Sequence, residues 1–136
     1  MIQQSDILNE ILNQTKLNQR QLALAVGYDP TNITKRFKNI NSMKLIDLID
    51  WLNKLDLELY FKTKKLNKLI KSQKDIILFI QEVLNVSNNN QLTEVFPENY
   101  DALSGFINDK RKVSLKKVID WSELLEFKFI IKKKTF

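Results

Sequence analysis

Hydroxyl, amide and cationic side chains gather in one short stretch of this chain. They are Thr31, Asn32, Thr34, Lys35, Arg36 and Lys38. Such groups donate and accept hydrogen bonds at base edges, and cations among them pair with phosphates. An ordinary solvated helix face is the alternative. The chain has no histidine and no cysteine, which removes the commonest general base and the usual zinc ligands. We therefore expect a binding protein and not an enzyme, with no metal and no cofactor.

The residues around this stretch predict two short helices joined by a tight turn. Asn18 and Gln21 have the spacing of a capping box, and the helix they begin should stop at Gly27. Asp29-Pro30 favours the start of the next helix, which should run to about Lys38. The polar stretch therefore lies on the second of the two helices.

The segment from Leu17 to Phe37 resembles the helix-turn-helix of the Cro/C1-type (XRE-like) repressor family. The matching features are Gln21, Leu22-Ala23, the turn glycine Gly27, the polar N-cap Asp29 and the apolar Ile33. The resemblance covers about residues 5–55 and implies a reader of double-stranded DNA. It implies these contacts for the first unit: Gln19, Arg20, Thr31, Asn32, Thr34, Lys35, Arg36 and Lys38. For Gln19, simple helix capping is the alternative. Phe37 and Lys38 depart from the family pattern, which puts the following loop in question.

The chain also repeats itself at an offset of 70 residues. Ile49-Asp50-Trp51 recurs as Ile119-Asp120-Trp121, and these are the only two tryptophans. Without gaps, residues 21–61 and 91–131 share seven identical positions out of 41. Both tryptophans face the apolar stripe of a helix, so we expect them in the core. The repeat predicts two tandem units, residues 1–65 and 66–136.

Apolar periodicity predicts the remaining elements. Helices are expected at about 5–16, 18–27, 30–38 and 43–54, and again at 73–85, 91–96, 100–108 and 114–124. Strands are expected at 55–61 and 126–132, and the basic connector 62–72 is expected to be helical near 66–70. Some antitoxin-type members of the family pair such strands between subunits, so Leu57–Phe61 and Phe127–Ile131 should pair antiparallel within this chain. The expected fold is mainly α, an internal pseudo-dimer joined by a two-stranded sheet and monomeric in solution. It is similar in outline to TraN-type DNA-binding proteins of conjugative plasmids.

The second unit differs chemically from the first. Asp101, Ala102 and Gly105 occupy the positions of Thr31, Asn32 and Lys35. A carboxylate repels phosphate and glycine has no side chain, so we expect weaker DNA contact there. The contacts expected in this unit are Tyr100, Asn108, Lys110, Arg111 and Lys112.

Composition agrees with a polyanionic partner, because the net charge is +6. A lysine-rich, low-GC genome would give the same balance. Lys132-Lys133-Lys134 could contact phosphate or form a solvated tail. The longest apolar run, Ile76 to Ile80, is too short to span a membrane, and no signal peptide is visible, so a cytoplasmic protein is expected. The function expected is a transcriptional regulator or nucleoprotein accessory factor of a plasmid or phage. The alternative is an antitoxin-like or antirepressor protein-interaction module.

Overall fold

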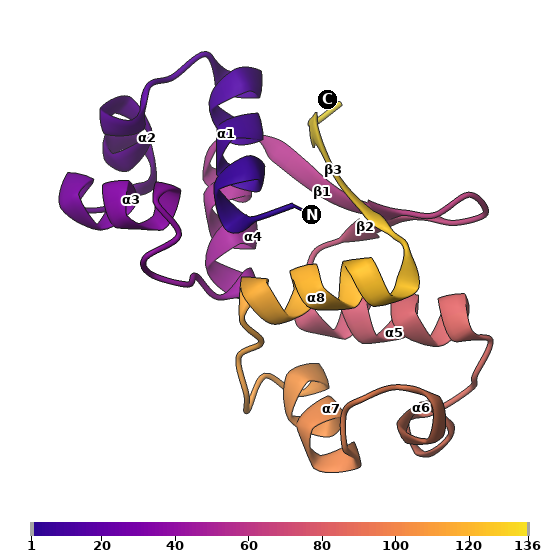
Figure 1. Cartoon of the computed structure of the whole chain (residues 1–136). Helices are drawn as coiled ribbons and strands as arrows, with labels where there is room; N and C mark the ends of the chain where they lie inside the picture. The colour runs from indigo at the N-terminus through magenta and orange to yellow at the C-terminus, as the bar shows by residue number, and fades with distance from the viewer. Residues whose placement is uncertain (1, 136) are drawn as a thin grey trace.

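The computed structural model describes residues 2–135, which form eight helices and three strands (Figure 1). The helices are α1 (Gln4–Thr15), α2 (Gln19–Val26), α3 (Pro30–Phe37), α4 (Leu45–Lys54), α5 (Gln73–Leu84), α6 (Asn89–Val95), α7 (Tyr100–Ile107) and α8 (Leu115–Leu125). The strands are β1 (Leu57–Lys62), β2 (Asn67–Ile70) and β3 (Lys128–Lys133). The mainly helical fold is as expected, and the eight helices predicted outside the connector 62–72 lie within a few residues of their predicted bounds. None of the helices in residues 2–135 is both long and apolar enough to cross a membrane.

The helix starts around the turn are those that the sequence predicts. The Asn18 side chain accepts from the Gln21 N–H at 2.8 Å, and the Gln21 side chain accepts from the Asn18 N–H at 3.0 Å. Gly27 has φ +72°, a left-handed conformation that glycine adopts without strain. The Asp29 side chain caps α3 by accepting from the Thr31 N–H at 2.8 Å. Short-range capping therefore fixes both ends of the turn.

The three strands form one antiparallel sheet in the order β2-β1-β3. β1 pairs with β3 from Leu57 opposite Lys133 to Lys62 opposite Lys128. The predicted antiparallel pairing of the two distant strands is therefore confirmed.

The prediction of helix near residues 66–70 is wrong, because this segment is strand β2. Thr63 turns the chain back: its N–H donates to the Leu66 carbonyl at 2.8 Å, and its hydroxyl accepts from the Leu66 N–H at 2.9 Å. Leu69 and Ile70 then lie opposite Tyr60 and Leu59 of β1. The sheet accordingly has three strands instead of the expected two.

The core lies between the inner face of the sheet and the helices. Phe61 of β1 is fully buried, with its ring centroid 5.6 Å from that of Phe79 on α5 and 4.7 Å from that of Phe127. Trp51 and Trp121 are also buried, which confirms their expected core position. Burial of this aromatic cluster ties both halves of the chain to one sheet.

A second contact between the halves joins the starts of α4 and α8. The Leu45 N–H donates to the Val113 carbonyl at 3.0 Å, and the Leu115 N–H donates to the Met43 carbonyl at 2.8 Å. These two hydrogen bonds frame an antiparallel bridge between Lys44 and Ser114. The bridge brings the N-terminal ends of the two helices together (Figure 1).

Candidate nucleic-acid interface

The helix pair α2 and α3 is held to the core by three apolar side chains. Leu22, Ala23 and Ile33 are fully buried. After the left-handed Gly27, the Tyr28 N–H donates back to the Ala23 carbonyl at 2.8 Å and closes the turn. Because Ile33 anchors α3 on one side, the opposite side of that helix faces solvent.

The structure brings three of the predicted contacts together on this free side of α3. Thr31, Asn32 and Lys35 are exposed there. Thr34 is partly buried, and its hydroxyl donates to the Pro30 carbonyl at 3.0 Å, so this group is used within the helix.

The other expected contacts of this unit lie on either side of α3. Gln19, at the start of α2, is partly exposed, and Arg20 next to it is exposed. Lys38, which follows α3, is exposed as well.

Arg36 was expected to face outward, and the structure turns it inward instead. Its side chain is only 12% exposed. The guanidinium carbon lies 4.5 Å from the centroid of the Tyr28 ring and 5.6 Å from that of Trp51, and the group donates to the Tyr28 hydroxyl. A carboxylate oxygen of Asp47 lies 3.9 Å from the Arg36 Nη1 atom. Stacking on two rings beside a carboxylate stabilises a cation that is partly removed from water.

A buried glutamine at the start of α1 holds the loop after α3. Gln4 is 7% exposed. Its side-chain amide donates to the Arg36 and Asn41 carbonyls at 3.0 and 2.8 Å, and its carbonyl accepts from the Met43 N–H at 2.8 Å. The Asn41 carbonyl and the Met43 N–H of this loop are thereby satisfied, while the Arg36 carbonyl also accepts from the Asn39 N–H at 3.2 Å.

The same arrangement occurs at the start of α5. Gln73 is 1% exposed and donates to the Phe106 and Arg111 carbonyls at 3.0 and 2.9 Å, while accepting from the Val113 N–H at 2.7 Å. We refer to Gln4 and Gln73 as the glutamine clamps. The sequence comparison missed them because they are 69 residues apart, not 70. The connection from α5 to α6 is one residue longer than that from α1 to α2, and allowing this single gap would have aligned the two glutamines.

The second helix pair presents a different surface. Tyr100 and Asp101 of α7 are exposed, whereas Ala102 and Gly105 are buried. Gly105 is covered by Arg111: a Cβ atom added there would lie 2.8 Å from both Cγ and Cδ of that arginine. Only glycine leaves room for the arginine stem to cross α7 at this point.

The remaining residues expected to contact DNA lie in the loop between α7 and α8. Asn108, Lys110 and Lys112 are exposed there, as Arg111 is. The Asn108 side chain accepts from the Lys110 N–H at 3.1 Å, so its oxygen is used within the turn. The second unit therefore offers cations from a loop and not from the exposed face of its helix.

The two helix pairs also differ in local charge. Residues 16–44 hold six basic side chains and one acidic one, whereas residues 85–117 hold five basic and four acidic. Anion binding is accordingly favoured at the first pair.

Comparison with known proteins identified no relative of this chain. No family model matches the chain, and neither the curated proteins nor the solved structures contain a significant match.

Proposed function

We propose that this chain binds double-stranded DNA, with α3 in the major groove and no catalytic step. The observation that carries the proposal is the free side of α3. A capped helix-turn-helix presents Thr31, Asn32 and Lys35 to solvent, within a segment that has a net charge of +5. Amide, hydroxyl and ammonium groups at these positions suit base edges, and the neighbouring exposed cations suit phosphates.

We also propose that the chain is an internal pseudo-dimer of two diverged units. Two contacts support this, because each joins a residue to its own counterpart 70 positions later. They are the Lys44–Ser114 bridge and the Tyr60–Ile130 pair at the middle of the β1–β3 register. A line through both contacts would be the pseudo-two-fold axis. The reciprocal Leu45 and Leu115 hydrogen bonds are exchanged by the same axis, and the glutamine clamps are counterparts 69 positions apart, one in each unit.

In this proposal the two units contact one duplex unequally. α3 and α7 both lie away from the sheet (Figure 1). The first unit reads bases, and the second holds the phosphate backbone through Lys110, Arg111 and Lys112. A transcriptional regulator or a nucleoprotein accessory factor would both use such a protein.

One observation favours a second candidate, a protein-interaction module of the antitoxin-like or antirepressor type. The exposed start of α7 carries Tyr100 and Asp101, an aromatic ring and a carboxylate that suit a protein partner better than DNA. On this alternative the helix-turn-helix would be a scaffold only.

The salt dependence of duplex binding separates the two candidates. If about five phosphates are neutralised, the slope of log K against log salt should be roughly −4 to −5. A flat response to salt, or no duplex binding at low ionic strength, would contradict DNA binding and favour the interaction module.

A further inference from the structure

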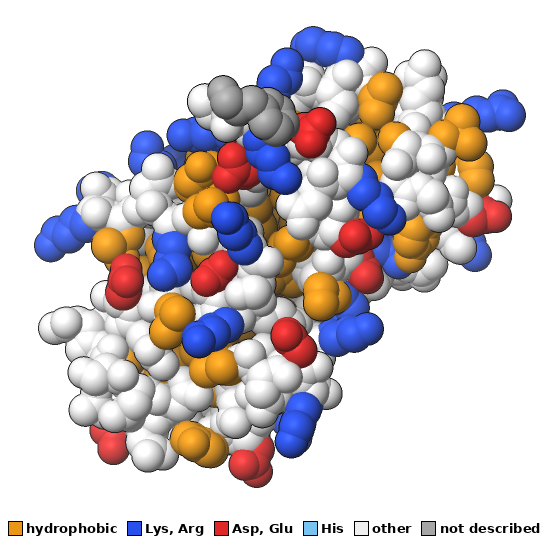
Figure 2. All heavy atoms as spheres, turned by 180° about the vertical axis from the view of Figure 1, so that it is seen from behind, with side chains coloured by type: hydrophobic (Ala, Val, Ile, Leu, Met, Phe, Trp, Pro, Cys, Tyr) orange, Lys and Arg blue, Asp and Glu red, His pale blue; other side chains and the backbone are white. Residues whose placement is uncertain are grey.

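The positive charge of the chain is concentrated in the sheet region. Residues 57–71 and 128–134 contain nine lysines and one acidic residue, Glu58. The rest of the chain holds thirteen basic and fifteen acidic residues, so the sheet region accounts for the whole excess of positive charge. Figure 2 shows Lys and Arg side chains crowding the upper left of the molecule, where the sheet lies. They are sparse at the lower left, over α6.

The two faces of the sheet differ because side chains alternate along each strand. The inner face is buried and carries Leu57, Leu59, Phe61, Ile70 and Ile131. The outer face carries, row by row, Lys62 opposite Lys128, Tyr60 opposite Ile130, and Glu58 opposite Lys132. Its lysines are exposed.

The centre of the outer face is a short apolar strip. Tyr60 lies between Leu69 of β2 and Ile130 of β3, and all three side chains are only partly buried. The Lys132 ammonium lies 5.2 Å from the centroid of the Tyr60 ring. A flat strip with a ring at its centre and ammonium groups around it can stack a base while contacting phosphates.

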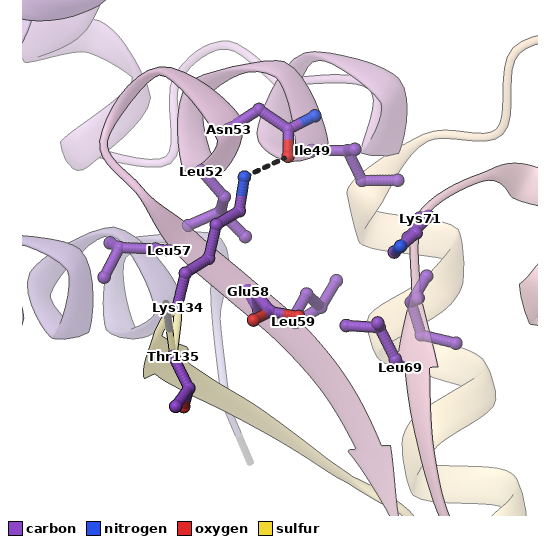
Figure 3. A pocket seen from close by; sticks show the side chains of 11 residues that line it. Ile49, Leu52, Asn53, Leu57, Glu58, Leu59, Leu69, Lys71, Lys134 and Thr135 are labelled. Carbon is purple, nitrogen blue, oxygen red and sulfur yellow. Dashed lines mark hydrogen bonds between the residues drawn. The ribbon is translucent and has the colours of Figure 1, made fainter.

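Further lysines lie beyond both ends of the strands. The hairpin between β1 and β2 carries Lys64 and Lys65. At the other end, Lys71 and Lys134 enter a hollow of about 410 Å³ between α4 and the sheet, where Lys134 donates to the Asn53 side chain at 3.4 Å (Figure 3). The six paired rows of β1 and β3 alone span about 20 Å, since a strand rises roughly 3.3 Å per residue. The lysines are therefore spread along the length of the strands and are not clustered at one place.

We propose that the outer face of the sheet binds a single strand of nucleic acid, separately from the duplex surface at α3. By the same alternation, Lys68 and Lys133 share the rows of the inner-face residues Phe61 and Leu57. The outer face therefore presents Lys62, Lys128 and Lys132, with Lys64 and Lys65 at the hairpin. Each lysine can contact a phosphate as a point charge. A linear array suits a polymer with regularly spaced charges. Unpaired bases can stack on the Tyr60 ring, whereas the paired bases inside a duplex cannot reach it.

The test is fluorescence anisotropy of a labelled 20-nucleotide oligo-dT with the full chain. Lys128→Gln combined with Lys132→Gln should weaken binding about tenfold and reduce the salt slope by about 1.4, since each phosphate contact on a single strand contributes about 0.7. Tyr60→Leu keeps the apolar strip but removes the ring, and should weaken binding about fivefold or more. Lys74→Gln, on the exposed surface of α5, is the matched control and should leave oligo-dT binding unchanged.

Three results would overturn this inference. They are oligo-dT affinity unaffected by the paired lysine substitutions, loss of oligo-dT binding in Lys35→Gln, and a poly-glutamate peptide that binds the same lysines more tightly than oligo-dT does. Failure of duplex recognition is a separate outcome. Wild-type protein that binds oligo-dT through the sheet yet shows no duplex binding would contradict the proposed function and leave the sheet proposal standing.

Discussion

At the scale of single residues, neighbours in space decide what a side chain can do. Lys35 and Arg36 are adjacent cations of α3, yet Lys35 is exposed whereas the Arg36 side chain is 12% exposed and stacked on Tyr28. Sequence reasoning grouped the two because helix position alone makes both look outward-facing. Tyr28, Trp51 and Asp47 come together around Arg36 only after folding, so no local pattern could have revealed its role.

Because Arg36 is turned inward, we expect its replacement to reduce the stability of the fold more than the affinity for DNA. Arg36→Ala should lower the free energy of unfolding by about 1–2 kcal/mol, because it removes a partly desolvated cation–π contact. Urea denaturation followed by circular dichroism measures this. Arg20→Ala, which changes an exposed arginine, is the control and should stay within about 0.5 kcal/mol of wild type. Unchanged stability of Arg36→Ala, together with equal loss of affinity for all duplexes, would show instead that Arg36 contacts phosphate.

Replacing a glutamine clamp by leucine, a side chain of similar size, should lower the free energy of unfolding more than Arg36→Ala does. Gln4→Leu removes the hydrogen-bond partner of the Asn41 carbonyl and of the Met43 N–H, whereas the Arg36 carbonyl still accepts from the Asn39 N–H. Each buried group left unsatisfied costs about 1–3 kcal/mol, so a loss of at least about 2 kcal/mol is expected. Gln73→Leu should behave alike, and Asn9→Leu on the exposed side of α1 should cost little. Comparable unfolding midpoints for Gln4→Leu and Asn9→Leu would refute the clamp.

At the scale of elements, the sequence predicts helix ends that are fixed by nearby residues. It does not predict features that depend on contacts between distant residues. Asn18, Gly27 and Asp29 fix the ends of α2 and α3 through bonds of short range, and those predictions are confirmed. Strand β2 was missed because its pairing with β1 outweighs the weak helical pattern of residues 66–70. The correspondence between the glutamine clamps was missed for another reason: the one-residue insertion before α6 shifts them out of the 70-residue alignment.

The contact between Gly105 and Arg111 gives a prediction about α7. Gly105→Ala should cost little stability, because the gain in helix propensity of about 1 kcal/mol offsets the displacement of Arg111. It should weaken duplex binding to the same extent as Arg111→Ala. In the Arg111→Ala background, adding Gly105→Ala should then have no further effect on affinity, which a double-mutant cycle measures. Additive losses would show that the glycine acts independently of the arginine.

At the scale of the whole molecule, both strands of the proposed pseudo-dimer find their partner in the same chain. The protein should therefore sediment as a monomer at micromolar concentration. Leu59 lies in the central strand and is 1% exposed, so Leu59→Lys should unfold the chain and not merely separate subunits. A dominant dimer that Leu59→Lys converts to folded monomers would contradict internal pairing.

The central claim is that α3 reads bases while the second unit only holds the duplex, and selection of bound duplexes from a random pool tests it most directly. The wild type should recover an asymmetric site with one strict and one loose half, about one helical turn or roughly 34 Å apart. Lys35→Ala should recover the same site with its preference relaxed at about one position of the strict half, a loss of about 1–3 kcal/mol there. Lys74→Ala should reproduce the wild-type motif. Two equally strict palindromic halves, or a motif that Lys35→Ala leaves unchanged, would contradict the account.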